Sequence, residues 1–320
     1  MLKDRILSTL KFFDLQDCPL TLLELHKFLL PEPEILTGLL DERGEIKNDA
    51  GPASPQVNIS QVQACLENEC QTEACCLYGY YALAGRRQII SGRWENYCYG
   101  IKREQLIAKF LPGVRHLPFI KGVSVLGSQA LGMPREGSDI DLLILVDSGR
   151  IGLARIFITS YFQMLGLRRH GRKVANRFCL NHYVAADKIL NSDRNLYTAS
   201  EYFKMRPAIS GRAVADFQKN NFSWMNRIFG NAPVIIPVDE SVSVARNFFE
   251  RLLGGKTGGF LERWVKKAQY GHINRGEFIV VSEDELSFHP NNRKQQLFNS
   301  FFDYVQRQRP KPPSLIPEVN

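Results

Sequence analysis

The sequence predicts an α+β fold: a mixed sheet with flanking helices, a winged-helix-like module before it and a mostly helical region after it. Three observations lead to this prediction. The N-terminal part reads as three helices and a hairpin, the middle holds a Gly-Ser turn between two strands, and apolar residues recur at helical spacing after about residue 195. We therefore expect domains at residues 1–95, 96–192 and 193–309, and a disordered proline-rich tail at 310–320.

The composition is that of a globular protein with a basic surface. The 320 residues are 44% hydrophobic and 23% charged, which are ordinary values. Lysine and arginine number 41 against 33 acidic residues, so the net charge is +8. Such an excess favours polyanionic partners or substrates, including nucleic acid bound by a basic surface.

Neither the start of the chain nor its cysteines indicate export or membrane insertion. An amphipathic helix opens the chain where a secretory signal would stand. The most apolar window, residues 151–167, is too short and too polar to span a bilayer. We expect a cytoplasmic protein with no membrane partner and with reduced thiols. Five cysteines cluster without the paired C-x₂-C spacing of structural zinc sites, so we predict free thiols there. They are Cys65, Cys70, Cys75, Cys76 and Cys98.

Apolar spacing and capping signatures predict the N-terminal helices. Residues 2–14 place apolar side chains on one helical face. Thr21 and Glu24 form a capping box at the start of a second helix, and Ser60 with Gln63 repeats this signature before a third.

A hairpin is predicted to follow the third helix. Its expected parts are a strand at residues 77–83, a turn at 84–86 and a return strand near 88–90. In a nucleic-acid reader, Arg86 and Arg87 would lie at the wing tip and meet a phosphate backbone. The alternative is a module used for packing or protein contact, because the polar residues of the third helix are not basic. These residues are Gln61, Gln63, Glu67 and Glu69.

The central strand–turn–strand unit indicates chemistry on phosphates. An apolar strand at Val123–Leu126 runs into Gly127 and Ser128, whose backbone N–H groups can cradle a phosphate. Asp139 and Asp141 open the second strand and point to the same face, because side chains alternate along a strand. Paired carboxylates suit Mg²⁺ or Mn²⁺, which in turn bind phosphates.

A run of basic residues follows these strands. Residues 92–116 are predicted to be helical, and a second helix is expected at about 150–165. Between Arg150 and Arg177 there is no acidic residue. The run is either a solvated face or a binding surface for nucleotide phosphates or a nucleic-acid strand. Its basic members are Arg150, Arg155, Arg168, Arg169, Arg172, Lys173 and Arg177.

The strand expected at residues 177–184 is where a third acidic ligand would be found. Asn181 has suitable neighbours, but its amide oxygen is a weaker Mg²⁺ ligand than a carboxylate. Asp187 could substitute only if the following turn folds back.

The C-terminal region is predicted to be mostly helical. Residues 254–259 resemble part of a phosphate-binding loop, but the motif requires glycine where Glu250 stands, so we predict a flexible loop. A short strand is expected at 278–281, a turn at 287–290 and a closing helix at 292–308.

The central motif consists of Gly127-Ser128, ten further residues that end with Ser138, and then Asp139-Ile140-Asp141. It resembles the signature of the DNA polymerase beta-like nucleotidyltransferase superfamily. The resemblance covers about residues 97–190. It implies a nucleotidyltransferase core in which Asp139 and Asp141 are catalytic and bind two Mg²⁺ (or Mn²⁺) ions.

The same resemblance implies a function for the other residues of the site. Gly127 and Ser128 would hold the triphosphate of the NTP. Ser138, and Arg168, Arg169 and Lys173 from the basic run, are further candidates for nucleotide binding. The enzyme would transfer an NMP from an NTP to a hydroxyl of a small molecule, RNA or protein. The third carboxylate of the family has no match at Asn181, the candidate third position. The alternative is therefore a catalytically weakened regulator that binds nucleotide or nucleic acid.

Overall fold

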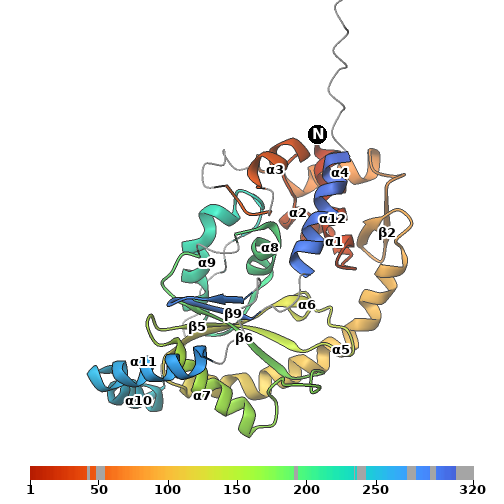
Figure 1. The fold of residues 1–320 in the computed structure, drawn as a ribbon. Helices are drawn as coiled ribbons and strands as arrows, with labels where there is room; N and C mark the ends of the chain where they lie inside the picture. Colours follow the sequence, from red (N-terminus) through yellow and green to blue (C-terminus); the bar gives the residue numbers. More distant parts are fainter. Residues whose placement is uncertain are drawn as a thin grey trace, which may run out of the picture. The chain divides into compact units, whose positions relative to one another are not determined.

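A computed structural model describes most of the chain, which divides into two compact units (Figure 1). Unit 1 comprises Met1–Ile90, Arg227–Asn231 and the segment that starts at Arg293; unit 2 comprises Ser91–Asn226 and Ala232–Asn292. The described residues are 1–41, 44–47, 55–190, 194–233, 235, 243–271, 279–288 and 293–307. The predicted tail at 310–320 lies outside them.

Unit 1 is a helical cluster with a small antiparallel sheet. Its centre is aromatic: the ring centroids of Phe13 and Phe28 are 5.3 Å apart, and those of Phe28 and Phe229 are 5.6 Å apart. The strands pair in the order β1-β3-β2. The helices are α1 (Leu2–Asp14), α2 (Leu22–Lys27), α3 (Pro33–Leu39), α4 (Ile59–Asn68) and α12 (Arg293–Arg307), and the strands are β1 (Leu20–Thr21), β2 (Ala74–Leu77) and β3 (Tyr80–Leu83).

Two helix starts in unit 1 test the capping predictions. The box at Thr21 and Glu24 is present at α2. The second prediction was wrong by two residues, because α4 is capped by Asn58, whose N–H donates to Gln61 Oε1 at 2.9 Å. Asparagine is as good a cap as serine, and Ile59 can then begin the helix.

The predicted hairpin turn at 84–86 was also wrong. The turn is formed by Tyr78 and Gly79, with φ of 52° and 77°, between β2 and β3. Two residues with positive φ give the turn whose twist matches a two-residue hairpin. Residues 88–90, predicted as a return strand, begin the helix α5 (Gln88–Phe110).

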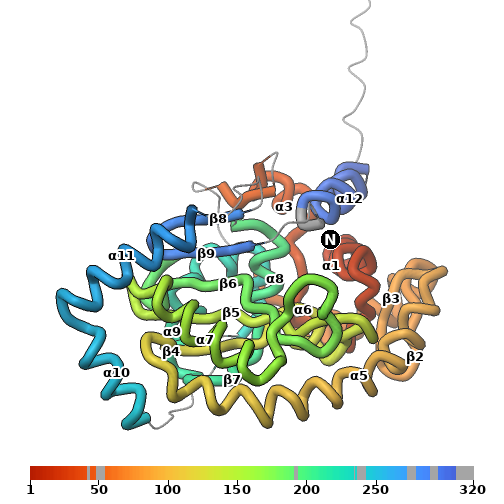
Figure 2. The backbone as a smooth tube through the Cα atoms, turned by 60° about the horizontal axis from the view of Figure 1, so that its bottom comes forward, coloured from red at the N-terminus to blue at the C-terminus, as the bar shows by residue number. Residues whose placement is uncertain are grey.

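Unit 2 is built on a six-stranded mixed sheet in the order β7-β4-β5-β6-β9-β8 (Figure 2). Only β5 and β6 run parallel; the other neighbours are antiparallel. Edge strand β7, which contains Pro207, was not predicted. The predicted turn at 287–290 was wrong as far as it is described, since Ser287 and Phe288 belong to β9. The strands are β4 (Ile120–Val125), β5 (Ile140–Val146), β6 (Phe178–Ala185), β7 (Arg206–Ile209), β8 (Ile279–Val281) and β9 (Glu285–Phe288).

Helices cover both faces of this sheet. Ile140, Leu142 and Ile144 of β5 belong to a fully buried core with α7, while α9 packs on β4 where Gly122 leaves room. The loop predicted at 254–259 was wrong, because Lys256 already begins α11. None of the described helices is long and apolar enough to cross a bilayer. The other helices of unit 2 are η1 (Leu111–His116), α6 (Gly127–Ala130), α7 (Ile151–Met164), α8 (Leu196–Lys204), α9 (Gly211–Met225), α10 (Val244–Gly254) and α11 (Lys256–Tyr270).

Candidate metal and phosphate site

Two carboxylates and a thiol converge where β5 begins. Asp139 precedes β5, Asp141 is its second residue, and Cys179 lies opposite Asp141 in β6. Ligand atoms of the three residues lie within 4.8 Å of one another. Asp139 Oδ2 is buried, and Arg169 Nη1 lies 2.8 Å from it as an ion pair. A divalent cation would fit the two carboxylates, because it would bind their oxygens and offset two adjacent negative charges.

A buried arginine fixes the loop that delivers Asp139. Arg103 of α5 is fully buried. Its Nη2 donates to three carbonyl oxygens, at 2.8 Å (Arg135), 2.9 Å (Glu136) and 2.8 Å (Ser138). The Ser138 hydroxyl also accepts from the Arg135 N–H at 3.1 Å. Ser138, predicted to bind nucleotide, therefore closes the turn before Asp139.

Gly127 brings the backbone against the carboxylate pair. Its φ is +65°, and a Cβ built there would lie 2.9 Å from Asp141 Oδ2. Only glycine combines this conformation with so close an approach. Ser128, the next residue, is exposed in the short helix α6.

The Gly127 N–H is already engaged by a glutamate that the sequence did not reveal. Glu201 of α8 accepts from it through Oε2 at 2.9 Å, and Glu201 Oε1 pairs with Lys204 at 2.6 Å. Glu201 and Lys204 are both buried. An acid and a base three residues apart on a helix read as an ordinary surface pair, so no sequence signal distinguished them.

Of the three predicted phosphate-binding cations, the structure brings Arg169 to the carboxylates. Its Nη1 lies 2.8 Å from Asp139 Oδ2 and 3.1 Å from Cys179 Sγ. The Arg168 side chain is half-buried, and Lys173 is exposed in a turn with His170. Neither Arg168 nor Lys173 forms a side-chain hydrogen bond or ion pair within the described part of the chain.

For the candidate third metal ligand, the structure places Cys179, and not Asn181, beside the two aspartates. Cys179 faces Asp141 across β5 and β6, and a bulge follows before Leu143 pairs with His182. The amide of Asn181 donates to the Phe288 carbonyl of β9 at 3.4 Å. The residue that joins the two aspartates is thus a cysteine two positions before the asparagine we selected.

Burial and mutual repulsion change the protonation of this cluster. Desolvation, and then the charges of Asp139 and Glu201, raise the pKa of Asp141 to about 7. Burial, followed by the charges of the two aspartates, raises the pKa of the Cys179 thiol well above its usual range. Without a bound cation the cysteine is a neutral thiol at neutral pH.

Asp141 is expected to make the metal-free protein less stable as the pH rises from about 4 to about 7. The unfolded carboxyl titrates near 3.8, whereas the folded one titrates at about 7. Within this window the folded state binds the extra proton, so the free energy of unfolding falls by up to about 1.4 kcal/mol per pH unit. Denaturant unfolding of wild type and Asp141→Asn across the window isolates this group. A constant difference between the two proteins would contradict the assignment.

Residues 107–201 match a family model described as a nucleotidyltransferase domain. The match contains Gly127, the aspartate pair, Cys179 and Glu201. No curated protein and no solved structure matches the chain.

Proposed function

Since residues 107–201 are a nucleotidyltransferase domain of the polymerase beta-like superfamily, we propose that the protein transfers an NMP from an NTP to a hydroxyl acceptor. The observation that carries this proposal is the convergence of Asp139 and Asp141 beside Gly127. The two aspartates would hold Mg²⁺ or Mn²⁺. Such ions, when bound, neutralise the triphosphate and polarise the phosphorus that is attacked.

The remaining site residues would bind and orient the triphosphate. Ser128 and the Gly127 N–H would donate to phosphate oxygens. Phosphate and the Glu201 carboxylate would compete for that N–H, so Glu201 would have to release it before a nucleotide phosphate could bind there. Arg169 would exchange Asp139 for a phosphate once a cation occupies the carboxylates, and Arg168 and Lys173 would add positive charge.

A second candidate is a nucleotide-binding regulator with weakened catalysis. It is favoured by Cys179, because a neutral thiol stands beside Asp141 where a third ligand would help to hold the metal. The strand order β1-β3-β2, with β1 between α1 and α2 and the β2–β3 hairpin after α4, supports the winged-helix-like interpretation of the N-terminal module. Arg86 is held by Asp14 and Asp17 at 2.6 and 2.7 Å, which favours packing or protein contact over phosphate binding.

Labelled NTPs test the proposal. The protein is incubated with each NTP, Mg²⁺ or Mn²⁺, and small-molecule, RNA or protein acceptors, and equilibrium binding of the NTP is measured separately. Asp141→Asn is expected to lower transfer by about 100-fold or more, equivalent to about 2.7 kcal/mol. The control is Asp147→Asn at the other end of β5, where Asp147 pairs with Lys121 at 2.9 Å.

The two readouts separate the candidate functions. Transfer that depends on Asp141 supports the enzyme, and tight NTP binding without transfer supports the regulator. Absence of both transfer and NTP binding would overturn both candidates.

A further inference from the structure

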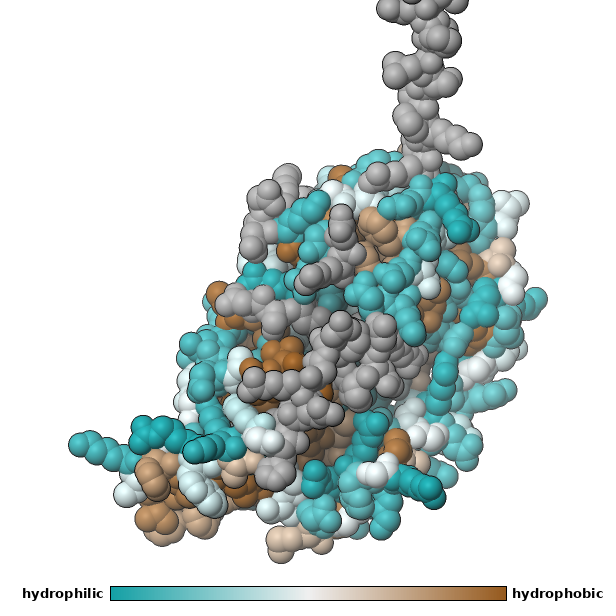
Figure 3. Space-filling view, in the orientation of Figure 1, coloured by the Kyte–Doolittle hydropathy of each residue, from teal (hydrophilic) through white to brown (hydrophobic). Residues whose placement is uncertain are grey.

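The helical hairpin formed by α10 and α11 turns an apolar face to solvent. Val244, Phe248 and Leu252 repeat at one helical spacing on α10, and Phe260 and Trp264 do so on α11. Each of the five is more than 60% exposed. Figure 3 shows apolar side chains gathered over this hairpin at the lower left. A monomer rarely leaves a contiguous patch of this kind unused.

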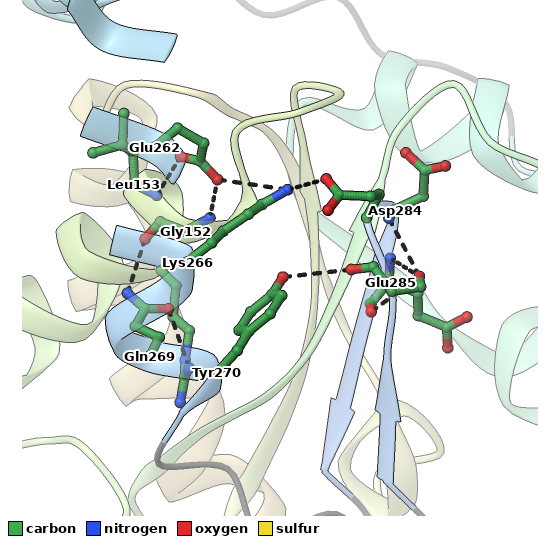
Figure 4. Close-up of polar contacts among 11 residues, drawn as sticks. Gly152, Leu153, Glu262, Lys266, Gln269, Tyr270, Asp284 and Glu285 are labelled. Atoms are coloured by element: carbon green, nitrogen blue, oxygen red, sulfur yellow. Dashed lines mark hydrogen bonds and ion pairs between the residues drawn. The ribbon is translucent and has the colours of Figure 1, made fainter. Parts of the chain in front are cut away.

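The orientation of the hairpin is fixed by polar contacts on its inner side (Figure 4). The Glu262 carboxylate accepts from the N–H groups of Gly152 and Leu153, at 2.6 and 2.8 Å, at the N-terminus of α7. Gln269 donates to the Gly152 carbonyl at 3.1 Å. The outward apolar face is therefore held in place by the fold, reversing the usual arrangement of a surface helix.

The junction of the two helices is tightly packed. A Cβ at Gly258 would fall 1.5 Å from the Leu253 carbonyl oxygen, so no other residue allows this packing. Val265 of α11 is buried in the core of unit 2, while the neighbouring Trp264 faces away. The hairpin thus presents one continuous outer surface.

The exposed charges of the hairpin are all positive. Its two acidic residues are turned inward, since Glu250 pairs with Arg246 at 2.9 Å and Glu262 caps α7. Every exposed charged residue of the hairpin is basic. These residues are Arg251, Lys256, Arg263 and Lys267.

We propose that α10 and α11 bind the surface of a membrane that contains anionic lipid. Aromatic and aliphatic side chains would enter the boundary between headgroups and acyl chains, and the four cations would lie on lipid phosphates. A second copy fits less well, because a symmetric contact would bring like charges together. The prediction of no membrane partner considered only spanning segments, which differ from a hairpin that lies on the surface. Surface binding is independent of nucleotidyl transfer.

Vesicles of phosphatidylcholine, with or without phosphatidylglycerol, test this proposal. The full chain is expected to cosediment with the anionic vesicles only, and to be released by salt. In the Trp94→Phe background Trp264 is the exposed tryptophan that remains, because Trp224 is 4% exposed. Its fluorescence should shift to shorter wavelength on binding.

Matched variants identify the surface. Two variants of the hairpin should each weaken vesicle binding by at least about tenfold. The first removes apolar side chains (Phe248→Ser/Phe260→Ser/Trp264→Ser), and the second reverses two charges (Arg263→Glu/Lys267→Glu). Trp94→Ser/Tyr97→Ser, which removes an exposed aromatic pair from α5, should not. Thermal unfolding checks that the variants fold.

Three results would overturn the proposal: no vesicle binding by the wild type, equal binding to neutral vesicles, or vesicle binding that the hairpin variants retain. A dimer in light scattering that dissociates in the triple variant would assign the face to a second copy instead.

Discussion

Replacing Cys179 by aspartate is expected to raise Mg²⁺-dependent nucleotidyl transfer by about tenfold or more. Cys179 lies opposite Asp141, with its sulfur within 4.8 Å of the ligand atoms of both aspartates. Mg²⁺ prefers oxygen ligands and is a poor match for sulfur. Because burial keeps the thiol protonated, the wild type offers Mg²⁺ two carboxylates, whereas the variant offers three.

The same substitution is expected to destabilise the protein when no metal is present. A third carboxyl beside Asp139 and Asp141 adds repulsion in a buried place. Thermal unfolding with and without Mg²⁺ should therefore show a larger stabilisation by Mg²⁺ in Cys179→Asp than in the wild type. Cys98→Asp is the control, since Cys98 is an exposed cysteine on α5.

A parallel Asn181→Asp variant compares the third position selected from the sequence with the one in the structure. If Asn181→Asp raises transfer and Cys179→Asp does not, the pairing of Cys179 with Asp141 does not define the third ligand. If neither variant changes transfer or stabilisation by Mg²⁺, a third carboxylate is not what limits this site.

The sequence could predict the Gly-Ser turn and the aspartate pair of this site, but not its third position. The Gly-Ser turn and the two aspartates depend on strand alternation and glycine conformation, which act within a few residues. The third position depends on the register of β5 against β6, parallel strands joined through α7, with a bulge after Asp141. Strand alternation alone places Cys179 and Asn181 on the same face and cannot choose between them.

The other features that the sequence did not reveal depend on contacts between distant parts of the chain. Arg103 and Glu201 reach the site from α5 and α8, and both look like ordinary helical surface residues in the sequence. The sequence predicted a mostly helical C-terminal region but could not show which face of α10 and α11 would turn inward, because Glu262 and Gln269 anchor the hairpin through α7.

Arg103→Met is expected to lower the free energy of unfolding by about 3 kcal/mol and to weaken Mn²⁺ binding. Methionine fills similar space but leaves the carbonyl oxygens of Arg135, Glu136 and Ser138 without this donor, at about 1–3 kcal/mol for each oxygen that water cannot reach. Part of this loss is offset, because the Nε and Nη1 of Arg103 are themselves buried and find no hydrogen-bond partner among the residues that the structure describes.

The effect on the metal separates a positioning role from simple packing. Once the loop before Asp139 is released, the Kd for Mn²⁺ should rise by about 10–100-fold, as when a residue that supports a metal ligand is lost. Arg103→Lys should rescue only part of the affinity, because an ammonium group cannot reproduce the planar fork of a guanidinium. Lys102→Met, an exposed neighbour on the same helix, is the control. If Arg103→Met unfolds more easily yet binds Mn²⁺ as tightly as Lys102→Met, Arg103 supports the fold alone and Asp139 is positioned by the strand that follows it.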